Sequence, residues 1–281
     1  MKLSLLRRNG YVNQRLHDEP FYLIHDKTIY IAKFGKVKSL MRMNSNSATV
    51  MILAAGIGSR LKPLTDLKPK ALVNYNGKPM LKRVIDNIVD QGFRRIVINT
   101  HHHASQIVEY LKRNDFGSTE VLISDESKML MDTGGGIIHA RSLLDGRGPF
   151  IVHNVDILSN IDLIKLLSYH RQYHPVATLV VKKRETSRQL GIDESGNLSG
   201  WKNNNSGETI SVPSKRITNY TAYSGIQVIN PVLFEMVHEQ RPFPIIPKYL
   251  ELAGNNQIKV YDQSDDDWID MASINHIERL S

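Results

Sequence analysis

Cysteine, long apolar runs and a secretion signal are all missing from this 281-residue sequence. Without cysteine the chain has no disulfide, no thiolate metal ligand and no cysteine nucleophile, which fits the reducing cytoplasm. Its apolar runs stay well short of the roughly 20 residues that cross a bilayer, so no membrane insertion is expected. Arg7 and Arg8 interrupt the apolar start, which argues against a signal peptide. We therefore expect a cytoplasmic protein.

The net charge of +8 suggests nucleic-acid binding until the chain is divided. Residues 1–48 carry nine Lys/Arg and three Asp/Glu, which leaves a net charge of only +2 for the rest of the chain. The main part of the chain therefore lacks the basic field that polyanion binding needs, and no nucleic-acid partner is expected.

The first 48 residues also differ from the rest in pattern. Apolar runs at 21–24 and 28–32 predict a hairpin, and the polar run 44–47 is typical of a linker. Methionines at 41, 43 and 51 are alternative starts in principle. We predict an N-terminal extension of unknown role, 1–48, followed by the main domain, 49–281.

From residue 49 onward, predicted strands and helices alternate. Strands are predicted at 49–54, 95–99, 120–124, 150–153 and 176–182, and helices at 79–91, 105–113, 136–144 and 161–173. This order predicts an α/β fold, a Rossmann-like, mostly parallel sheet with helices on both faces. Short segments at 189–192, 197–201 and 223–229 predict a smaller antiparallel region attached to that sheet.

The most specific motif begins where the first predicted strand ends, and reads Leu-Ala-Ala-Gly-Ile-Gly-Ser-Arg-Leu-Lys-Pro-Leu-Thr over residues 53–65. Glycines after a strand let backbone N–H groups approach a phosphate, and Arg60 and Lys62 add cationic donors. A plain tight turn is the structural alternative. A dinucleotide-binding turn is disfavoured, because Leu61 occupies the third glycine position and Pro63 prevents an immediate helix.

This segment resembles the signature of the sugar-phosphate nucleotidyltransferase family, which includes N-acetylmuramate 1-phosphate uridylyltransferases and mannose 1-phosphate guanylyltransferases. Residues 68–73 resemble the family's second element, Pro-Lys-Pro-Leu/Met, with Ala71 in place of a proline. The resemblance covers about residues 50–277. It implies Mg²⁺-dependent transfer of a nucleoside monophosphate from an NTP to a sugar 1-phosphate, with release of pyrophosphate. A role in NDP-sugar and cell-envelope polysaccharide synthesis is also implied.

The resemblance implies a nucleotide-binding set in the signature and in a later glycine run. Its members are Leu53, Ala54, Ala55, Gly56, Gly58, Ser59, Gly134 and Gly135. The glycine run, at residues 132–137, resembles Glu-Thr-Gly-Gly-Gly-Ile. Three glycines before a helix would leave an open backbone surface for a base or sugar, and the alternative is a flexible helix entry.

Three residues are implied to be catalytic: Arg60, Lys70 and Asp156. Arg60 is expected to hold the triphosphate and Lys70 to neutralise charge on the α-phosphate. Asp156 follows a predicted strand in Asn-Val-Asp, which resembles the family's Asn-Gly-Asp. Its carboxylate suits Mg²⁺, although an Asp after a strand is also a common turn former. Asp270, in a segment resembling Trp-x-Asp-Ile-Gly-Thr-Pro-Glu, is expected to share the metal.

Substrate contacts are implied for Asn154, Lys202 and Gly225. Lys202 stands where family members often place a lysine near the sugar phosphate, and plain surface exposure is its alternative. Gly225 lies in a segment that resembles the family's Thr-Gly-Ile.

Other functions remain open. A cytidylyltransferase acting on a non-sugar phosphate such as phosphocholine is one, and a non-catalytic sugar-nucleotide binder is another, favoured if the segment of Asp270 cannot bind metal. The base and the sugar depend on a few pocket hydrogen bonds, which the sequence does not specify.

Overall fold

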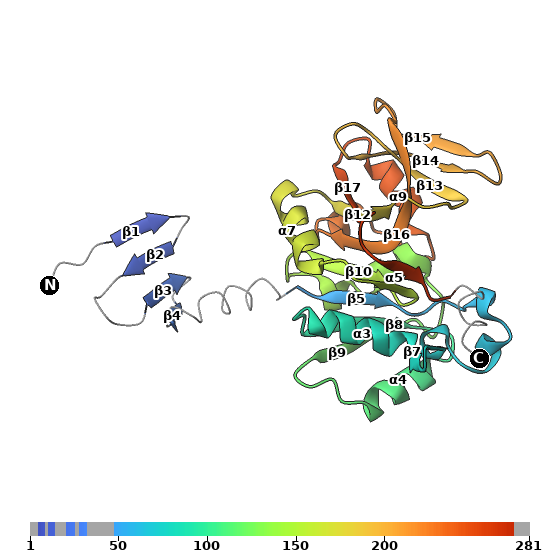
Figure 1. Cartoon of the computed structure of the whole chain (residues 1–281), viewed down its shortest axis with the longest axis horizontal. Helices are drawn as coiled ribbons and strands as arrows, with labels where there is room; N and C mark the ends of the chain where they lie inside the picture. Colours follow the sequence, from blue (N-terminus) through green and yellow to red (C-terminus); the bar gives the residue numbers. More distant parts are fainter. Residues whose placement is uncertain (1–4, 9–10, 15–20, 26–27, 33–47, 273–281) are drawn as a thin grey trace. The chain divides into compact units, whose positions relative to one another are not determined.

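The computed structural model describes residues 5–8, 11–14, 21–25, 28–32 and 48–272, and the chain divides into two units, 1–47 and 48–281. The first unit contains a four-stranded antiparallel sheet in sequence order (Figure 1). Its strands are β1 (Leu5–Arg8), β2 (Tyr11–Gln14), β3 (Phe21–His25) and β4 (Thr28–Ala32). The predicted hairpin is confirmed as the pair β3–β4, in which Ile24 lies opposite Ile29.

The second unit is built on a ten-stranded sheet, and four neighbouring strands of its core run parallel. In spatial order these are β10 (Phe150–Asn154), β5 (Val50–Leu53), β8 (Arg95–Thr100) and β9 (Glu120–Asp125). Because parallel strands end at the same edge, the segments that follow them meet there. The predicted Rossmann-like α/β fold is confirmed.

The rest of the sheet continues from β10 through the long strand β16 (Asn219–Ile229), which runs antiparallel to it. Beyond β16 lie β13 (Arg188–Ile192), β14 (Leu198–Asn203) and β15 (Thr209–Ser211), all antiparallel. β12 (Ala177–Lys182) also pairs with β16, and β17 (Ile258–Asp262) runs parallel to β12. The predicted antiparallel region is thus part of the same sheet (Figure 1).

Helices cover both faces of this sheet. Because side chains of a strand alternate between the faces, one strand contributes to the core on each side. Val50 and Ile52 of β5 pack in one core cluster with α3 (Met80–Asp90), α4 (Ala104–Arg113) and α7 (Leu163–Tyr173). Met51 packs in the other cluster with α5 (Asp132–His139), α6 (Arg141–Leu144), α8 (Leu233–Met236) and α9 (Ile245–Leu252).

Short elements complete the edge where the parallel strands end. After β5 come η1 (Ser59–Leu61), α2 (Leu64–Leu67) and η2 (Lys70–Leu72), followed by the hairpin β6 (Asn74–Tyr75) and β7 (Lys78–Pro79). After β10, β11 (Ile157–Ser159) pairs with β18 (Trp268–Asp270). None of the helices in the described residues has the length and apolar character of a membrane span.

Candidate active site

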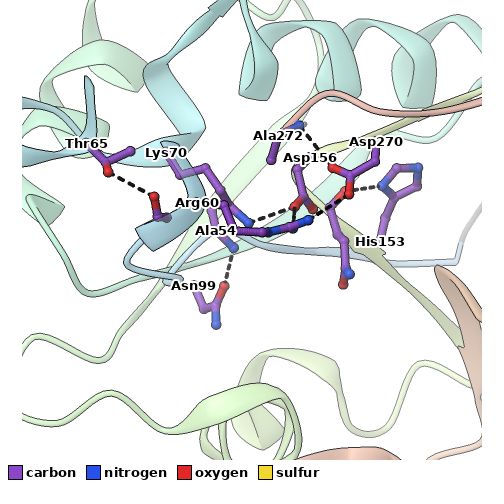
Figure 2. Close-up of polar contacts among 11 residues, drawn as sticks. Ala54, Arg60, Thr65, Lys70, Asn99, His153, Asp156, Asp270 and Ala272 are labelled. Atoms are coloured by element: carbon purple, nitrogen blue, oxygen red, sulfur yellow. Dashed lines mark hydrogen bonds and ion pairs between the residues drawn. The ribbon is translucent and has the colours of Figure 1, made fainter. Parts of the chain in front are cut away.

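The signature segment is anchored to the sheet by a buried amide on the neighbouring strand. Asn99, near the end of β8, accepts the N–H groups of Ala54 and Ala55 through Oδ1, at 2.7 and 3.3 Å. Figure 2 shows this contact beside the charged groups of the site. The sequence analysis did not single out Asn99, although a polar Asn at the end of an apolar strand run can indicate a residue of a site. It fixes the direction of the backbone as the chain leaves β5.

A buried carboxylate extends this anchor to a third strand. Glu126 directly follows β9, is 2% exposed, and accepts the Asn99 amide at 2.7 Å. Its second oxygen accepts the N–H of Met131 at 3.1 Å, just before α5. Within 48–272, no Lys, Arg or His lies within ion-pair distance of Glu126. Three loops at the edge of the sheet are therefore held by one hydrogen-bonded pair.

Gly58 is required by the shape of the loop. Its φ is +72°, a left-handed conformation that side chains rarely adopt. A Cβ there would also lie 2.9 Å from the Cβ of Lys70 and from the Cγ2 of Thr65. Thr65 donates its hydroxyl to the Gly58 carbonyl at 2.9 Å (Figure 2). The loop thus folds back tightly on the segment that carries Lys70.

Two cations and two carboxylates meet beyond the ends of β5 and β10 (Figure 2). Lys70 Nζ lies 3.0 Å from Asp156 Oδ2. Arg60 bridges the carboxylates, with Nη2 3.4 Å from Asp156 Oδ2 and Nη1 3.0 Å from Asp270 Oδ2. We call Arg60, Lys70, Asp156 and Asp270 the charged cluster. It unites the three predicted catalytic residues and the second predicted metal ligand.

Strand pairing brings Asp270 to Asp156. β11 follows Asp156 directly, and Ile157 on it lies opposite Asp270 on β18. The Asp156 carbonyl also accepts the N–H of Met271 at 2.8 Å. Asp270 Oδ1 accepts the N–H of Ala272 at 3.0 Å (Figure 2). The departures from the family pattern around Asp270 therefore do not move it out of the site.

The members of the charged cluster differ in how far their side chains are exposed to solvent. The Asp156 and Lys70 side chains are 7% and 15% exposed, whereas that of Arg60 is 63% exposed. Burial opposes the charge of Arg60, but the hydrogen bond to Asp270 and the charges of both carboxylates outweigh it and raise the pKa of Arg60. Lys70 and Asp156 thus form a fixed inner pair, and Arg60 lies at the solvent side.

Two adjoining cavities open at this edge. The loop cavity, of 520 Å³, is bounded by residues 55–59 of the signature and by Lys70, Asp156 and Glu126. The sheet cavity, of 630 Å³, is bounded by side chains of β13, β14, β16 and α9. Both are lined by Leu53, Asp132, Thr133 and Asn154. The shared lining joins them into one cleft, with Lys70 and Asp156 of the charged cluster on its loop side.

The glycine run does not form the open surface that the sequence suggested. Gly134 and Gly135 lie inside α5, which begins at Asp132, whereas the predicted helix began at Gly136. Their N–H groups both donate to the carbonyl of Phe243, at 2.9 and 3.2 Å. A Cβ on Gly134 would lie 2.2 Å from the Phe243 ring. These glycines therefore serve close packing of α5 against the 241–243 segment, and their nucleotide-binding role stays a prediction without a free backbone donor behind it.

Of the predicted substrate residues, Asn154 lies at the cleft, Gly225 lies against Asn154, and Lys202 lies outside the cleft lining. Asn154 lines both cavities. Gly225 has φ +79°, and a Cβ on it would lie 2.9 Å from Asn154 Nδ2, so this glycine makes room for the Asn154 side chain. Lys202 lines neither cavity, and its ammonium lies over the Tyr220 ring at 4.1 Å. Lys202 is half-buried, and its substrate role stays a prediction with no cavity contact behind it.

His153, next to these residues on β10, is fully buried. Burial lowers its pKa to about 4, and its Nδ1 lies 2.8 Å from the Asn154 carbonyl oxygen. The imidazole is therefore neutral near pH 7, as expected of a structural histidine.

Comparison with known proteins identifies the family. The family described as "Nucleotidyl transferase" matches residues 49–279. The chain belongs to the nucleotidyl transferase family. This confirms the family expected from the signature at residues 53–65.

Curated relatives of this nucleotidyl transferase include sugar-phosphate enzymes. The mannose-1-phosphate guanylyltransferase catalytic subunit beta of Drosophila pseudoobscura pseudoobscura is 30% identical over 218 residues, covering 74% of this chain and 56% of that protein. The N-acetylmuramate alpha-1-phosphate uridylyltransferase of Caulobacter vibrioides is 38% identical over 116 residues, covering 41% of this chain and 48% of that protein. The chain thus spans about half the length of the curated relatives it matches.

Solved structures share the fold. HddC from Yersinia pseudotuberculosis, also solved as a complex with GMP-PN, matches with a TM-score of 0.67 at 22% identity, covering 83% of this chain and 97% of that one. A putative glucose-1-phosphate thymidylyltransferase from Bacillus anthracis gives a TM-score of 0.67 at 17% identity, covering 83% of this chain and 94% of that one. At such identities these matches support the fold alone.

Proposed function

We propose that this nucleotidyl transferase moves a nucleoside monophosphate from an NTP to a sugar 1-phosphate, giving an NDP-sugar and pyrophosphate. The observation that carries the proposal is the charged cluster, which lies at a cleft composed of two adjoining cavities. The loop cavity suits the triphosphate of the donor, because the small residues Ala55, Gly56, Gly58 and Ser59 line it beside Lys70 and let backbone N–H groups approach a phosphate. The sheet cavity, which is larger and lined by side chains, suits the acceptor.

The reaction needs positioning and charge neutralisation more than proton transfer. An oxygen of the acceptor phosphate attacks the α-phosphorus of the NTP. The bond from that phosphorus to the oxygen bridging to the β-phosphate breaks, and pyrophosphate leaves with the electron pair. The attacking oxygen is already anionic, so no general base is required. In this proposal Lys70 neutralises charge on the α-phosphate, and Arg60 leaves the carboxylates to hold the departing phosphates.

Residues of the cluster also fit a divalent metal ion, for which we propose Mg²⁺. Asp156 and Asp270 present carboxylate oxygens from paired segments, and Mg²⁺ in proteins is commonly held by one or two carboxylates together with substrate phosphates. When bound there, the ion would supply Lewis-acid neutralisation of the phosphates. The pairing of β11 with β18 favours a catalytic protein over a non-catalytic binder, since the second carboxylate is in place.

Location and pathway are part of the proposal. We assign the protein to the cytoplasm, where NTPs are available, and its product to the NDP-sugars that feed cell-envelope polysaccharide synthesis. Support comes from the names of the relatives, which include an N-acetylmuramate alpha-1-phosphate uridylyltransferase.

The test is a screen of the purified chain with four NTPs against mannose, glucose and N-acetylmuramate 1-phosphates, read by pyrophosphate release with and without Mg²⁺. We expect Mg²⁺-dependent release with at least one combination. Release with phosphocholine and CTP, but with no sugar 1-phosphate, would instead establish a cytidylyltransferase. Tight NTP binding without any release would establish a non-catalytic binder.

A further inference from the structure

Two arginines line the sheet cavity without a carboxylate partner. Arg184 follows β12 and Arg188 begins β13. The other charged side chains that line this cavity are Asp132 and Glu208. Over residues 48–272, neither arginine has a carboxylate oxygen within 4.0 Å, whereas Arg60 in the charged cluster has two. Two positive charges thus line the acceptor side of the cleft without a direct ion-pair partner among residues 48–272.

Arg184 is held in place by its surroundings. Its guanidinium stacks over the Trp268 ring, 4.4 Å from the centroid. Its Nη2 donates to the Tyr223 carbonyl at 3.0 Å, and its Nη1 to the Glu185 carbonyl at 3.4 Å. Each contact uses one N–H of its nitrogen, which leaves a second N–H on both. Burial lowers the pKa of Arg184, and the nearby charge of Asp270 partly offsets this.

Arg184 lines the sheet cavity and also contacts the strand that carries Asp270 of the charged cluster. Trp268, on which it stacks, lies on β18 two residues before Asp270. Trp268 is itself fixed, because its indole N–H donates to the Ser224 carbonyl at 2.9 Å. A phosphate beside Arg184 would thus lie in the sheet cavity, on the side of Asp270, whose charge acts on Arg184.

We propose that Arg184 binds the phosphate group of the sugar 1-phosphate acceptor and orients it toward the charged cluster. The assignment rests on the proposed function, since it names the acceptor contact of that reaction. A planar guanidinium can offer two parallel N–H groups to a phosphate, and stacking reduces the freedom it loses on binding. Arg188, exposed on the rim of the cavity, adds charge without a comparable support.

The strand geometry explains why Arg184, and not Lys202, takes this role. Trp201 and Asn203 of β14 both line the sheet cavity. Side chains alternate along a strand, so Lys202 between them points to the other face. The position that the family resemblance suggested is therefore turned away from the acceptor, and the charge comes from the segment after β12.

The tryptophans of the chain can report binding at this site by their fluorescence. It has two tryptophans, of which Trp201 lines the cavity and Trp268 stacks on Arg184. Tryptophan fluorescence of the full chain can therefore be titrated with mannose, glucose and N-acetylmuramate 1-phosphates, and separately with mannose and with pyrophosphate. The dissociation constant, and not the amplitude, is compared among variants, because Arg184 itself contacts the fluorophore.

We expect saturable binding of at least one of the three sugar 1-phosphates, weakened about 10- to 100-fold in Arg184→Gln and less in Arg184→Lys. Lys183→Gln, which removes the same charge at the exposed neighbouring position, and Lys202→Gln should bind as the wild type does. Mannose without phosphate should not distinguish Arg184→Gln from the wild type. Thermal melts verify that each variant is folded.

Three results would overturn the assignment. They are unchanged affinity for the sugar 1-phosphate in folded Arg184→Gln, an equal loss of affinity for pyrophosphate and sugar 1-phosphate in that variant, and no binding of any sugar 1-phosphate by the wild type. Arg184-dependent binding without pyrophosphate release in the activity screen would support the phosphate site and refute the proposed reaction. The two proposals can therefore fail separately.

Discussion

The two sides of the cleft are built differently. The loop cavity is shaped largely by backbone held in place by Asn99, Glu126 and Gly58, and its cations are paired with carboxylates. The sheet cavity is shaped by side chains from several strands, and within 48–272 its two arginines have no carboxylate at ion-pair distance. A triphosphate is common to all NTPs and can be bound by backbone, whereas different sugars require different side chains. The loop side is therefore recognisable from a linear motif and the sheet side is not.

The largest expected effect comes from removing the inner carboxylate. Asp156→Asn should abolish Mg²⁺-dependent pyrophosphate release, because one of two proposed metal ligands is lost at a cost of several kcal/mol in the transition state. Asp265→Asn, an exposed change in the loop before β18, is the matched control and should keep wild-type turnover. Near-normal turnover of folded Asp156→Asn at saturating Mg²⁺ would show that the metal site lies elsewhere.

The cations of the cluster come next. Arg60→Ala and Lys70→Ala should each lower kcat/KM for the NTP by at least ~100-fold, since each removes a charge-assisted phosphate contact. The double variant should lose less than the product of the two effects if both cations serve one transition state. Steady-state kinetics at saturating acceptor measure this. Wild-type kinetics in either single variant would remove that residue from the donor site.

The anchor of the loop should matter to one substrate only. Asn99→Ala leaves the buried N–H groups of Ala54 and Ala55 without their acceptor, at a cost of about 1–3 kcal/mol for each group left unsatisfied. We expect KM for the NTP to rise about tenfold, with little change in KM for the sugar 1-phosphate. Asn114→Ala, at the end of α4, is the control. Equal changes in both KM values would show that the two cavities are not separate in function.

Acid should destabilise the sheet where its parallel and antiparallel parts join. Burial lowers the pKa of His153 on β10, and of His170 on α7, to about 4. Their ordinary value is near 6.5, so between these two values the unfolded chain takes up protons that the folded chain does not. The contribution of the two neutral histidines to the free energy of unfolding is therefore fully present above about pH 6.5. It is lost as the pH falls toward 4, and the loss is on the order of a few kcal/mol.

Thermal melts from pH 7.5 to pH 4.5 measure this loss. We expect the Tm to fall by several degrees over this range. His170→Gln should reduce the slope, whereas His238→Gln at an exposed position should not. A Tm that is flat with pH in the wild type would contradict the burial of these imidazoles.

Removal of the N-terminal extension should have the smallest effect. The family match begins at residue 49 and β5 at Val50, so a chain starting at Met43 retains the whole α/β domain. We expect it to be soluble and to release pyrophosphate at the full-length rate. The apolar residues of β3 and β4 argue the other way, since such residues favour a covering surface. An insoluble product, or a Tm lower by more than ~10 °C, would mean that the extension completes the domain.

The sequence alone determined the α/β alternation, the signature loop at 53–65 and the candidate catalytic residues. Each depends on local spacing: apolar periodicity marks the strands and helices, and the chemistry of a strand end lies in the few residues that follow it. Asp156 could be read in this way because it directly follows β10. Asp270 could be read only through the family resemblance, and the sequence did not show how the two carboxylates meet.

The tertiary structure decided which distant residues face one another. Pairing of β11 with β18 brings Asp270 to Asp156, and the Asn99–Glu126 pair joins the ends of two strands. The N–H groups of Gly134 and Gly135 donate to the Phe243 carbonyl, so they are not free for a ligand. Because side chains alternate along a strand, Lys202 points to the face opposite the cleft. These outcomes depend on register and close packing between segments far apart in the chain. Local propensity does not encode them, because they follow from which faces are buried when the whole sheet forms.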